Sequence, residues 1–406
     1  MSPLNHDDHV VVVGAGLAGW RFAEILRQLG FRGAVTMVGD ESRAPYDRPP
    51  LSKQILSGKW TLDKATLATP SKLGLADVEL LLGRRAVRLD ADARRVELDD
   101  GTMLSGTHVV VATGTRARRL SFAGSGALPT LRTADDVTQL NERISRLEPG
   151  AAVAVIGGGF VGAEVATSLA ARGLRPVVLE AAERPLVGVV GEEASDWLAR
   201  LAPAADIELR THQHIRDVLS ADQRFYVEFD EGPALEVGAV LAAVGSALDL
   251  AWLDDSGLHL DEGVHVDENL QAAPQVAAIG DVARFAYRGG NEREHIRVEH
   301  WQVAADHAWH LAHYWMGEAV TPAVPYFWSD QYGKKIQMLG HPHAQDEVVR
   351  VSGSDEELKW LALYARNGLV TGILALSNPR GLATSKVLLD EITTIDDALS
   401  RTPWAS

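Results

Sequence analysis

An α/β fold is predicted for this chain of 406 residues, and a strand–turn–helix pattern near its N-terminus is the first reason. A β-branched run at residues 10–13 ends in Gly14, Gly16 and Gly19, and apolar residues at helical spacing follow. The first glycine of such a turn permits a tight bend, the second lets the backbone approach a pyrophosphate, and the third lets helix and strand pack closely. We interpret this stretch as a strand, a phosphate-binding turn and a helix.

The second reason is that the pattern occurs again in the middle of the chain. Residues 153–156 form another apolar run that ends in Gly157, Gly159 and Gly162. Two complete fingerprints are far more specific than one. Further buried strands are expected at residues 237–244 and 276–279, so the second unit is predicted to be inserted within the first. The predicted architecture is two Rossmann-like dinucleotide-binding domains, followed by a C-terminal α+β domain.

The third reason is a change of composition near residue 322. Aromatic residues 326–328 precede several alternating, strand-like runs, which predict a small antiparallel sheet with a closing helix near Lys386. The predicted domains are a discontinuous dinucleotide-binding domain at 1–115 and 248–321, a second one at 116–247, and a C-terminal domain at 322–406.

Composition narrows the function further. Hydrophobic residues make up 46% and charged residues 23%, as in ordinary globular proteins. The net charge of −16 argues against general nucleic-acid binding or binding to anionic membranes. The sequence has neither an apolar run of membrane-spanning length nor a signal peptide, so we expect a cytoplasmic protein. The chain has no cysteine, which excludes disulfides, thiolate nucleophiles and cysteine-ligated metal centres. No metal site is predicted, and any redox chemistry must belong to a bound organic cofactor.

Carboxylates follow several of the predicted strands. Asp40 lies 21 positions after Gly19, and either Asp40 or its neighbour Glu41 would bind ribose hydroxyls. Glu180 lies 18 positions after Gly162 and would favour NADH, because its charge repels the extra phosphate of NADPH. Arg184, close by, would favour the opposite preference.

Two further segments carry candidate binding groups. Asp281 follows a buried strand and a glycine, where it would either bind a cofactor or cap a helix. Pro49 and Pro50 predict a rigid loop that presents Arg48 and Lys53, with Ser52 capping a helix that begins at about Lys53.

Taken together, these motifs resemble the FAD-dependent, NADH-using ferredoxin reductases of oxygenase and P450 systems. The resemblance spans nearly the whole chain, and it implies the fold of the pyridine nucleotide-disulfide oxidoreductases without their redox disulfide. The motifs that carry it are residues 14–19, 48–53, 112–114, 157–164, 280–281, 299–301 and 327–332.

The resemblance also implies site residues. Glu164 resembles the acid that lies beside the nicotinamide in this family and is paired with a lysine near the flavin N5, which corresponds to Lys53. Lys53 and Glu164 are therefore the predicted catalytic residues. The implied FAD contacts are Gly14, Gly16, Ala18, Gly19, Asp40, Arg48, Lys53, Val87, Ala112, Arg132, Asp281 and Trp301. The implied NADH contacts are Gly157, Gly159, Gly162 and Glu180.

The implied activity is transfer of electrons from NADH through FAD to a 2Fe–2S ferredoxin, which serves a P450 or a Rieske oxygenase. Related disulfide reductases need a dithiol that this chain lacks. Two alternatives stay open: a rubredoxin reductase, and a redox-sensing flavoprotein that resembles apoptosis-inducing factor. The sequence departs from the family pattern at residues 246–249 and 303–307. An acidic ferredoxin would need a local basic dock, for which the candidates are Arg284, Arg288, Arg293, Arg297, Lys334 and Lys335.

Overall fold

The computed structural model describes residues 3–405 and divides into two compact units. Unit 1 contains the described residues up to 47 together with 65–116 and 248–327. Unit 2 contains residues 48–64, 117–247 and those from 328 onward. The short segment 48–64 therefore belongs with the second glycine-rich motif, although it precedes that motif by about a hundred positions. The division into three domains, predicted from the sequence, stays a prediction.

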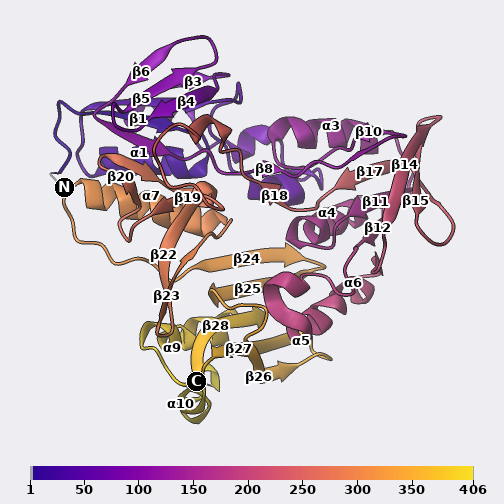
Figure 1. Ribbon diagram of the computed structural model, residues 1–406. Helices are drawn as coiled ribbons and strands as arrows, with labels where there is room; N and C mark the ends of the chain where they lie inside the picture. Colours follow the sequence, from indigo (N-terminus) through magenta and orange to yellow (C-terminus); the bar gives the residue numbers. More distant parts are fainter. Residues whose placement is uncertain (1–2, 406) are drawn as a thin grey trace. The chain divides into compact units, whose positions relative to one another are not determined.

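Unit 1 is built around a six-stranded sheet with the strand order β20-β21-β7-β1-β2-β3 (Figure 1). Strand β1 lies in its centre and pairs in parallel with both β2 and β7. Valines suit this place because β-branched side chains pack well on both faces of a buried parallel strand. The strands are β1 His9–Val13, β2 Ala34–Gly39, β3 Glu79–Leu82, β7 His108–Val111, β20 Gln271–Ala273 and β21 Val276–Ala278.

Two helices of unit 1 pack against each other. Helix α1 (Leu17–Gln28) buries Trp20 and Phe22, and α7 (Trp301–Trp315) buries Trp315. The rings of Phe22 and Trp315 meet edge to face with their centroids 5.4 Å apart, a favourable aromatic geometry. The other elements of unit 1 are α2 Pro70–Ala76, β4 Ala86–Asp90, β5 Arg95–Leu98, β6 Met103–Ser105, η3 Ala251–Leu253, β19 Val264–Val266, η4 Gly280–Val282, β22 Ala283–Gly289 and β23 Glu292–Ile296. The 3₁₀ turn η2 (Leu62–Ala65) crosses the boundary, with residues 62–64 in unit 2 and Ala65 in unit 1.

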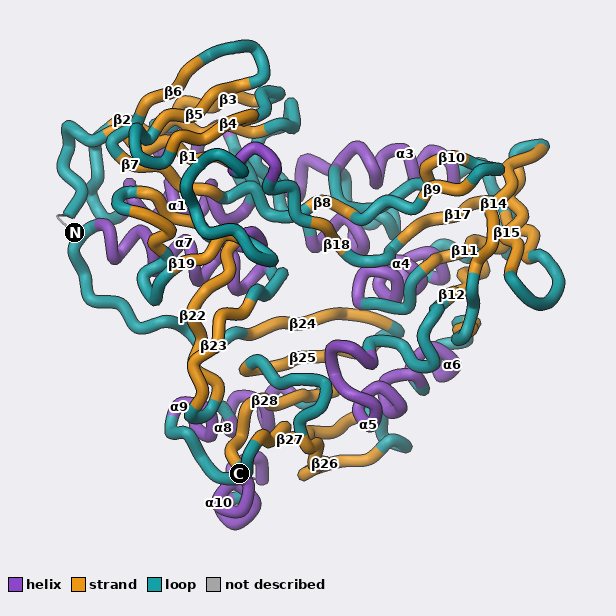
Figure 2. Tube along the Cα trace, in the orientation of Figure 1, coloured by secondary structure: helices purple, strands orange, loops and turns teal. Residues whose placement is uncertain are grey.

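Unit 2 contains a four-stranded parallel sheet with the order β13-β12-β11-β17. The strand predicted at 237–244 is divided at Gly238, where a Cβ would lie 2.6 Å from the side chain of Leu147. Its first part joins a separate antiparallel sheet with β14 and β15, drawn in orange in Figure 2. The elements are α3 Ala134–Ile144, β11 Ala152–Ile156, α4 Phe160–Ala170, β12 Arg175–Leu179, α5 Val187–Ala199, α6 Leu201–Ala204, β13 Glu208–Arg210, β14 Ile215–Ala221, β15 Arg224–Phe229, β16 Leu235–Val237 and β17 Ala239–Ala242, with short strands β8 Arg116–Ala117, β9 Ser121–Phe122, β10 Gly126–Ala127 and β18 Ser246–Ala247.

The C-terminal part of the chain forms a five-stranded sheet with the order β24-β25-β28-β27-β26 (Figure 1). Strands β25, β28, β27 and β26 pair antiparallel, as the alternating pattern predicts, and helices α8 and α9 flank Lys386. The elements are β24 Tyr326–Gln331, β25 Lys334–Gly340, β26 Glu347–Ser354, β27 Lys359–Arg366, β28 Leu369–Leu376, α8 Pro379–Ser385, α9 Val387–Asp390, α10 Ile395–Arg401 and η5 Pro403–Ala405.

The helix after the two prolines differs from the prediction. It includes Pro50 and continues as a π-helix, η1 (Leu51–Ile55), in which Leu56 N donates to Leu51 O at 3.2 Å. Proline is well tolerated in a first helical turn, where its missing N–H has no helical partner to lose. The helix therefore begins before Ser52, and the prediction that Ser52 caps it is wrong. The helix-capping alternative for Asp281 is also wrong, because Asp281 lies inside the 3₁₀ turn η4 and strand β22 follows directly.

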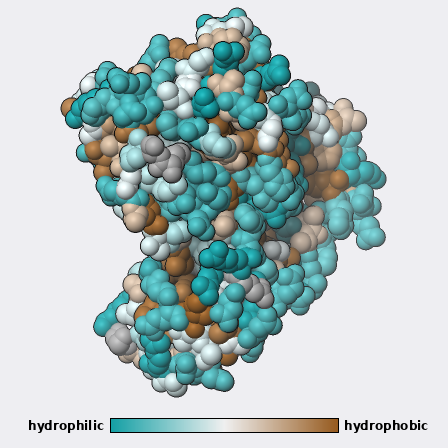
Figure 3. Space-filling model, turned by 60° about the vertical axis from the view of Figure 1, so that its left-hand side comes forward, coloured by the Kyte–Doolittle hydropathy of each residue, from teal (hydrophilic) through white to brown (hydrophobic). Residues whose placement is uncertain are grey.

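The surface is mainly hydrophilic on the face shown in Figure 3, with hydrophobic side chains gathered in small patches. Among residues 3–405, none of the helices combines the length and the apolar character needed to cross a bilayer.

The fully buried His307 predicts how the stability of unit 1 depends on pH. Burial, followed by the nearby His310, lowers the pKa of His307 from 6.5 to about 3. The folded chain thus keeps this ring neutral where the unfolded chain protonates it, so stability is complete above pH 6.5 and falls as the pH drops towards 3. Between pH 6.5 and pH 5, His307 should cost about 2 kcal/mol. We expect His307→Gln to remove this part of the acid loss in urea unfolding at pH 7 and pH 5. An unchanged acid loss in the variant would contradict the assignment.

Gly14, Gly16 and Gly19 predict two different mutational effects. A Cβ on Gly19 would lie 2.2 Å from the carbonyl oxygen of Gly14, whereas a Cβ on Gly16 would meet nothing within 4 Å. Gly19→Ala should therefore lower the free energy of unfolding by about 1–3 kcal/mol, the usual cost of overpacking. Gly16→Ala is the matched control and should change it little. Urea denaturation of the ligand-free protein measures both, and equal costs for the two variants would count against close helix–strand packing at Gly19.

Candidate functional site

The first glycine-rich turn, in unit 1, is an open cradle at the start of a helix. Gly14 has a φ of +121°, and a Cβ there would lie 2.2 Å from the carbonyl oxygen of Ala112. Gly16 is the N-cap residue of α1, and the first turn of that helix contains no acid. The N–H groups of a helix start attract anions. Because the space beside Gly16 is empty of protein atoms, this turn fits a pyrophosphate.

Asp281 is brought to the same helix by its neighbour. Gly280 has a φ of +72°, and a Cβ on it would lie 3.1 Å from Cβ of Ala18 on α1. Its N–H donates to Nδ1 of His307 at 3.2 Å, which fixes the turn that carries Asp281. This approach of the turn η4, which follows β21, to α1 agrees with a shared ligand for Gly14–Gly19 and Asp281.

Trp301 lies at the start of α7 and has a partner that the sequence did not indicate. Its indole Nε1 donates to Oδ1 of Asp47 at 2.5 Å. Asp47 directly precedes Arg48, so this hydrogen bond fixes the end of unit 1 from which the chain enters segment 48–64.

The two candidate ribose-binding acids after β2 have different surroundings. Asp40 is about half exposed and accepts from Arg116 at 2.9 Å, while Glu41 accepts from the hydroxyl of Tyr46 at 2.6 Å. Asp40 is therefore the more open carboxylate at the end of β2. Val87 lies on β4, in the separate sheet β4-β5-β6, and is 42% exposed.

The second glycine-rich turn, in unit 2, repeats the geometry of the first. Gly157 has a φ of +107°, and a Cβ there would lie 2.4 Å from the carbonyl oxygen of Ala243. A Cβ on Gly162 would lie 2.0 Å from the oxygen of Gly157, and Gly159 is the N-cap residue of α4 with nothing within 4 Å of a Cβ. This turn also fits a pyrophosphate.

Glu180 ends the strand next to this turn and is held by backbone groups. Its Oε2 accepts from Gly158 N at 2.7 Å, and its Oε1 accepts from Ala182 N at 2.9 Å. The carboxylate thus has a fixed place beside the glycine-rich turn, as the predicted role in ribose binding requires.

Lys53 and Glu164 are in direct contact, as the resemblance implies. Nζ of Lys53 lies 2.7 Å from Oε2 of Glu164, and the side chain of Glu164 is 8% exposed. Lys53 comes from η1 and Glu164 from α4, two elements of unit 2 that pack together. A buried carboxylate needs such a partner because leaving its charge unpaired is costly.

Two serines complete the surroundings of Glu164, and sequence reasoning assigned neither of them this role. Ser52 donates to Oε2 at 2.6 Å and Ser329, on β24, donates to Oε1 at 2.7 Å. Ser168 on α4 in turn donates to the carbonyl oxygen of Ser52 at 2.6 Å. The motif 327–332 contains Ser329, but the spacing of some 165 residues gives no sign that it reaches Glu164.

Arg48 and Arg132 also meet in unit 2. Arg48 Nη1 donates to the carbonyl oxygen of Arg132 at 2.5 Å. The backbone N–H of Arg132 donates to Asp136 at 2.8 Å, and Asp136 forms a capping box with Thr133 at the start of α3. Helix α3 thereby fixes the position of both arginines.

The predicted site residues fall into two groups, each within one unit. Unit 1 carries Gly14, Gly16, Ala18, Gly19, Asp40, Val87, Ala112, Asp281 and Trp301, and unit 2 carries Arg48, Lys53, Arg132, Gly157, Gly159, Gly162, Glu164 and Glu180.

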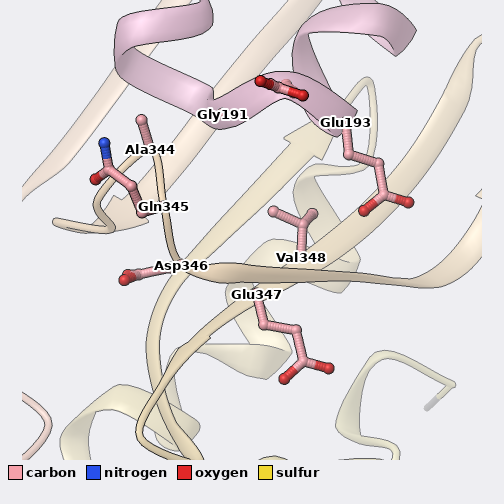
Figure 4. Close-up of a pocket in the computed structure, with 8 residues that line it drawn as sticks. Gly191, Glu193, Ala344, Gln345, Asp346, Glu347 and Val348 are labelled. Carbon is pink, nitrogen blue, oxygen red and sulfur yellow. The ribbon is translucent and has the colours of Figure 1, made fainter.

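A separate pocket in unit 2 lies between the N-terminal part of α5 and segment 344–348 (Figure 4). Its lining includes the carboxylates of Glu192, Glu193, Asp346 and Glu347. Asp346 is already paired with Arg366 at 2.8 Å. Because negative charges repel phosphate groups, a pocket with this many acidic residues does not suit a dinucleotide.

Comparison with known proteins gives a family model that spans both glycine-rich turns. Residues 8–308 match the family model of pyridine nucleotide-disulphide oxidoreductases, and residues 326–403 match the model of the reductase C-terminal domain.

Similar proteins resemble the chain over nearly its whole length. A ferredoxin–NAD(+) reductase component of a p-cumate 2,3-dioxygenase system from Pseudomonas putida is 33% identical, over 95% of this chain and 94% of that protein. Putidaredoxin reductase from Pseudomonas putida is 30% identical, over 96% and 93%. The crystal structure of the covalent putidaredoxin reductase–putidaredoxin complex has a TM-score of 0.88 and 28% identity, and the match covers 99% of both chains. The predicted family and fold class are confirmed: this chain belongs to the pyridine nucleotide-disulphide oxidoreductase family and carries the reductase C-terminal domain.

Proposed function

We propose that this chain is an NADH-dependent reductase that passes electrons through FAD to a 2Fe–2S ferredoxin serving a P450 or Rieske oxygenase. The observation that carries the proposal is the Lys53–Glu164 pair at 2.7 Å, which lies in the unit that also carries the second glycine-rich turn. Ferredoxin reductase components of oxygenase systems among the relatives support it.

The two glycine-rich turns divide the cofactors between them in this proposal. Gly14, Gly16 and Gly19 would hold FAD together with Asp281, and Gly157, Gly159 and Gly162 would hold NADH together with Glu180. The remaining FAD contacts would come from Ala18, Asp40, Arg48, Val87, Ala112, Arg132 and Trp301. The domain boundaries proposed above follow the same division, and the proposed location is the cytoplasm.

When bound, FAD accepts a hydride from nicotinamide and releases single electrons, chemistry that no side chain of the chain supplies. Lys53 would place a positive charge where negative charge develops. Glu164 would keep that ammonium group in place, and Ser52 and Ser329 would each hold one of the carboxylate oxygens. The backbone N–H groups at the starts of α1 and α4 would bind the pyrophosphates.

The predicted ferredoxin dock receives less support. Several of its basic side chains already pair with carboxylates, which reduces their pull on an acidic partner. The pairs are Arg284 with Asp261 at 2.5 Å, Arg293 with Glu268 at 3.9 Å, Arg297 with Glu299 at 2.5 Å and Lys335 with Asp330 at 2.8 Å.

A direct test separates the proposal from its alternatives. Anaerobic titration of the yellow holoprotein with NADH should bleach the flavin, and a 2Fe–2S ferredoxin should then support reduction of cytochrome c. If the predicted basic dock binds the ferredoxin, raising the salt concentration should slow the ferredoxin reaction more than reduction of a small artificial acceptor, and equal salt responses would count against the dock. A long-lived reduced complex with slow turnover would favour the redox sensor, and turnover with rubredoxin alone would favour a rubredoxin reductase.

Lys53→Ala tests the catalytic pair. We expect flavin reduction by NADH to slow by about tenfold to a hundredfold, because one electrostatic stabiliser of the transition state is lost. Stopped-flow absorbance measures the rate, and the flavin spectrum shows whether FAD stays bound. Lys59→Ala, an exposed lysine of the same segment, is the control. The double variant Lys53→Met/Glu164→Gln avoids an unpaired buried charge, and a wild-type rate in that variant would remove the pair from the mechanism.

A further inference from the structure

Arg184 lies in the loop that, in dinucleotide-binding folds, carries the residues that discriminate between NADH and NADPH. It follows Glu180 by four positions, in the loop after β12. An arginine near the ribose-binding acid is the group that accommodates the 2′-phosphate of NADP in dinucleotide-binding folds. Its guanidinium is planar, permanently charged and suited to phosphate. Arg184 therefore has the chemistry of an NADPH-selecting residue beside an acid that selects NADH.

The structure engages this arginine elsewhere. Nε of Arg184 donates to Oδ1 of Asp196 on α5 at 2.6 Å, and Nη1 lies 3.4 Å from Oε2 of Glu183. The hydrogen bond to Asp196 is the main cause that raises the pKa of Arg184 above its usual value, with further help from the charges of Asp196, Glu183 and Glu192. Acidic side chains thus compete with any phosphate for this guanidinium.

Glu180 is fixed as well, but by a different kind of partner. Both of its oxygens accept backbone N–H groups, from Gly158 and from Ala182. Main-chain N–H groups thus position Glu180, whereas Arg184 is paired with a side chain of another element, Asp196 on α5. Only the second arrangement can be removed by substituting one surface side chain, that of Asp196.

We propose that Asp196 is a specificity-determining residue: it occupies Arg184 and so prevents this chain from binding the 2′-phosphate of NADPH. The proposal rests on the proposed use of NADH at the second glycine-rich turn. In this proposal, Asp196 offsets the preference for NADPH that the guanidinium of Arg184 would otherwise create.

Asp196 is open to mutation without loss of the fold. Its side chain is 53% exposed, and that of Arg184 is 27% exposed. Exposed ion pairs of this kind contribute little to stability. Removing the carboxylate should free the arginine while leaving α5 folded.

The test compares Asp196→Ala with a control of the same charge change. Glu208→Ala also removes one partly exposed carboxylate from unit 2, where it pairs with Arg175 and Arg210, and it leaves Arg184 untouched. The probes are adenosine 2′,5′-bisphosphate and ADP, whose dissociation constants are measured by calorimetry on the holoprotein. We expect Asp196→Ala to bind the 2′-phosphate probe about threefold to fivefold more tightly relative to ADP, the most that an exposed ion pair competing for the same guanidinium can withhold. Glu208→Ala should leave this ratio unchanged.

The gain must also depend on Arg184. Adding Arg184→Ala to Asp196→Ala should abolish it, and the ratio of kcat/KM for NADPH and NADH should follow the same order. Equal binding ratios in Asp196→Ala and Glu208→Ala, or a gain that survives loss of Arg184, would overturn the proposal. If the wild-type protein binds ADP and oxidises NADH, but the binding ratios of Asp196→Ala and Glu208→Ala are equal, only the role of Asp196 is overturned. If the wild-type protein binds neither ADP nor NADH, the proposed function is overturned as well.

Discussion

The buried carboxylate of Glu164 is the constraint on which unit 2 depends. Its charge is compensated by Lys53, and its two oxygens accept hydroxyl hydrogen bonds from Ser52 and Ser329. These donors come from η1 and β24, elements separated by more than 270 residues. Because an uncompensated buried charge is costly, the contacts of both elements with Glu164 on α4 stabilise unit 2. These contacts help to hold segment 48–64 in unit 2, although its neighbours in sequence belong to unit 1.

The same arrangement suits chemistry as well as folding. An ammonium group held only by its carboxylate would lose its place if that carboxylate turned. Here Ser329 fixes one oxygen, and Ser52 shares the other with the lysine. Glu164 thereby keeps hydrogen-bond partners that do not depend on Lys53, so the carboxylate holds its position while the lysine also faces another group. Such preorganisation is what an electrostatic stabiliser needs in order to act without rearrangement.

Much of the fold could be predicted from the sequence because local patterns determine it. The glycines at 14, 16 and 19 and at 157, 159 and 162 stand where a strand must turn into a helix, and the structure places each set as expected. The π-helix η1 could not be predicted, since it depends on Leu56 N reaching Leu51 O inside a packed unit. The contacts of Ser329 with Glu164 and of Asp196 with Arg184 could not be predicted for a related reason. Their partners are distant in sequence or on another element, and a lone serine or surface aspartate gives no periodic signal.

Charge pairing connects the remaining features of this acidic chain. The net charge is −16, and several arginines pair with carboxylates: Arg116 lies between Asp40 and Asp249, and Arg184 meets Asp196. Each pair withdraws a cation that would otherwise attract a phosphate or an acidic protein. The N–H groups at the starts of α1 and α4, by contrast, have no acid in the first turns of these helices to compete for them, so they suit an anionic ligand. Recognition by main-chain groups of two glycine-rich turns is therefore compatible with an acidic surface, whereas recognition by a broad basic face is not.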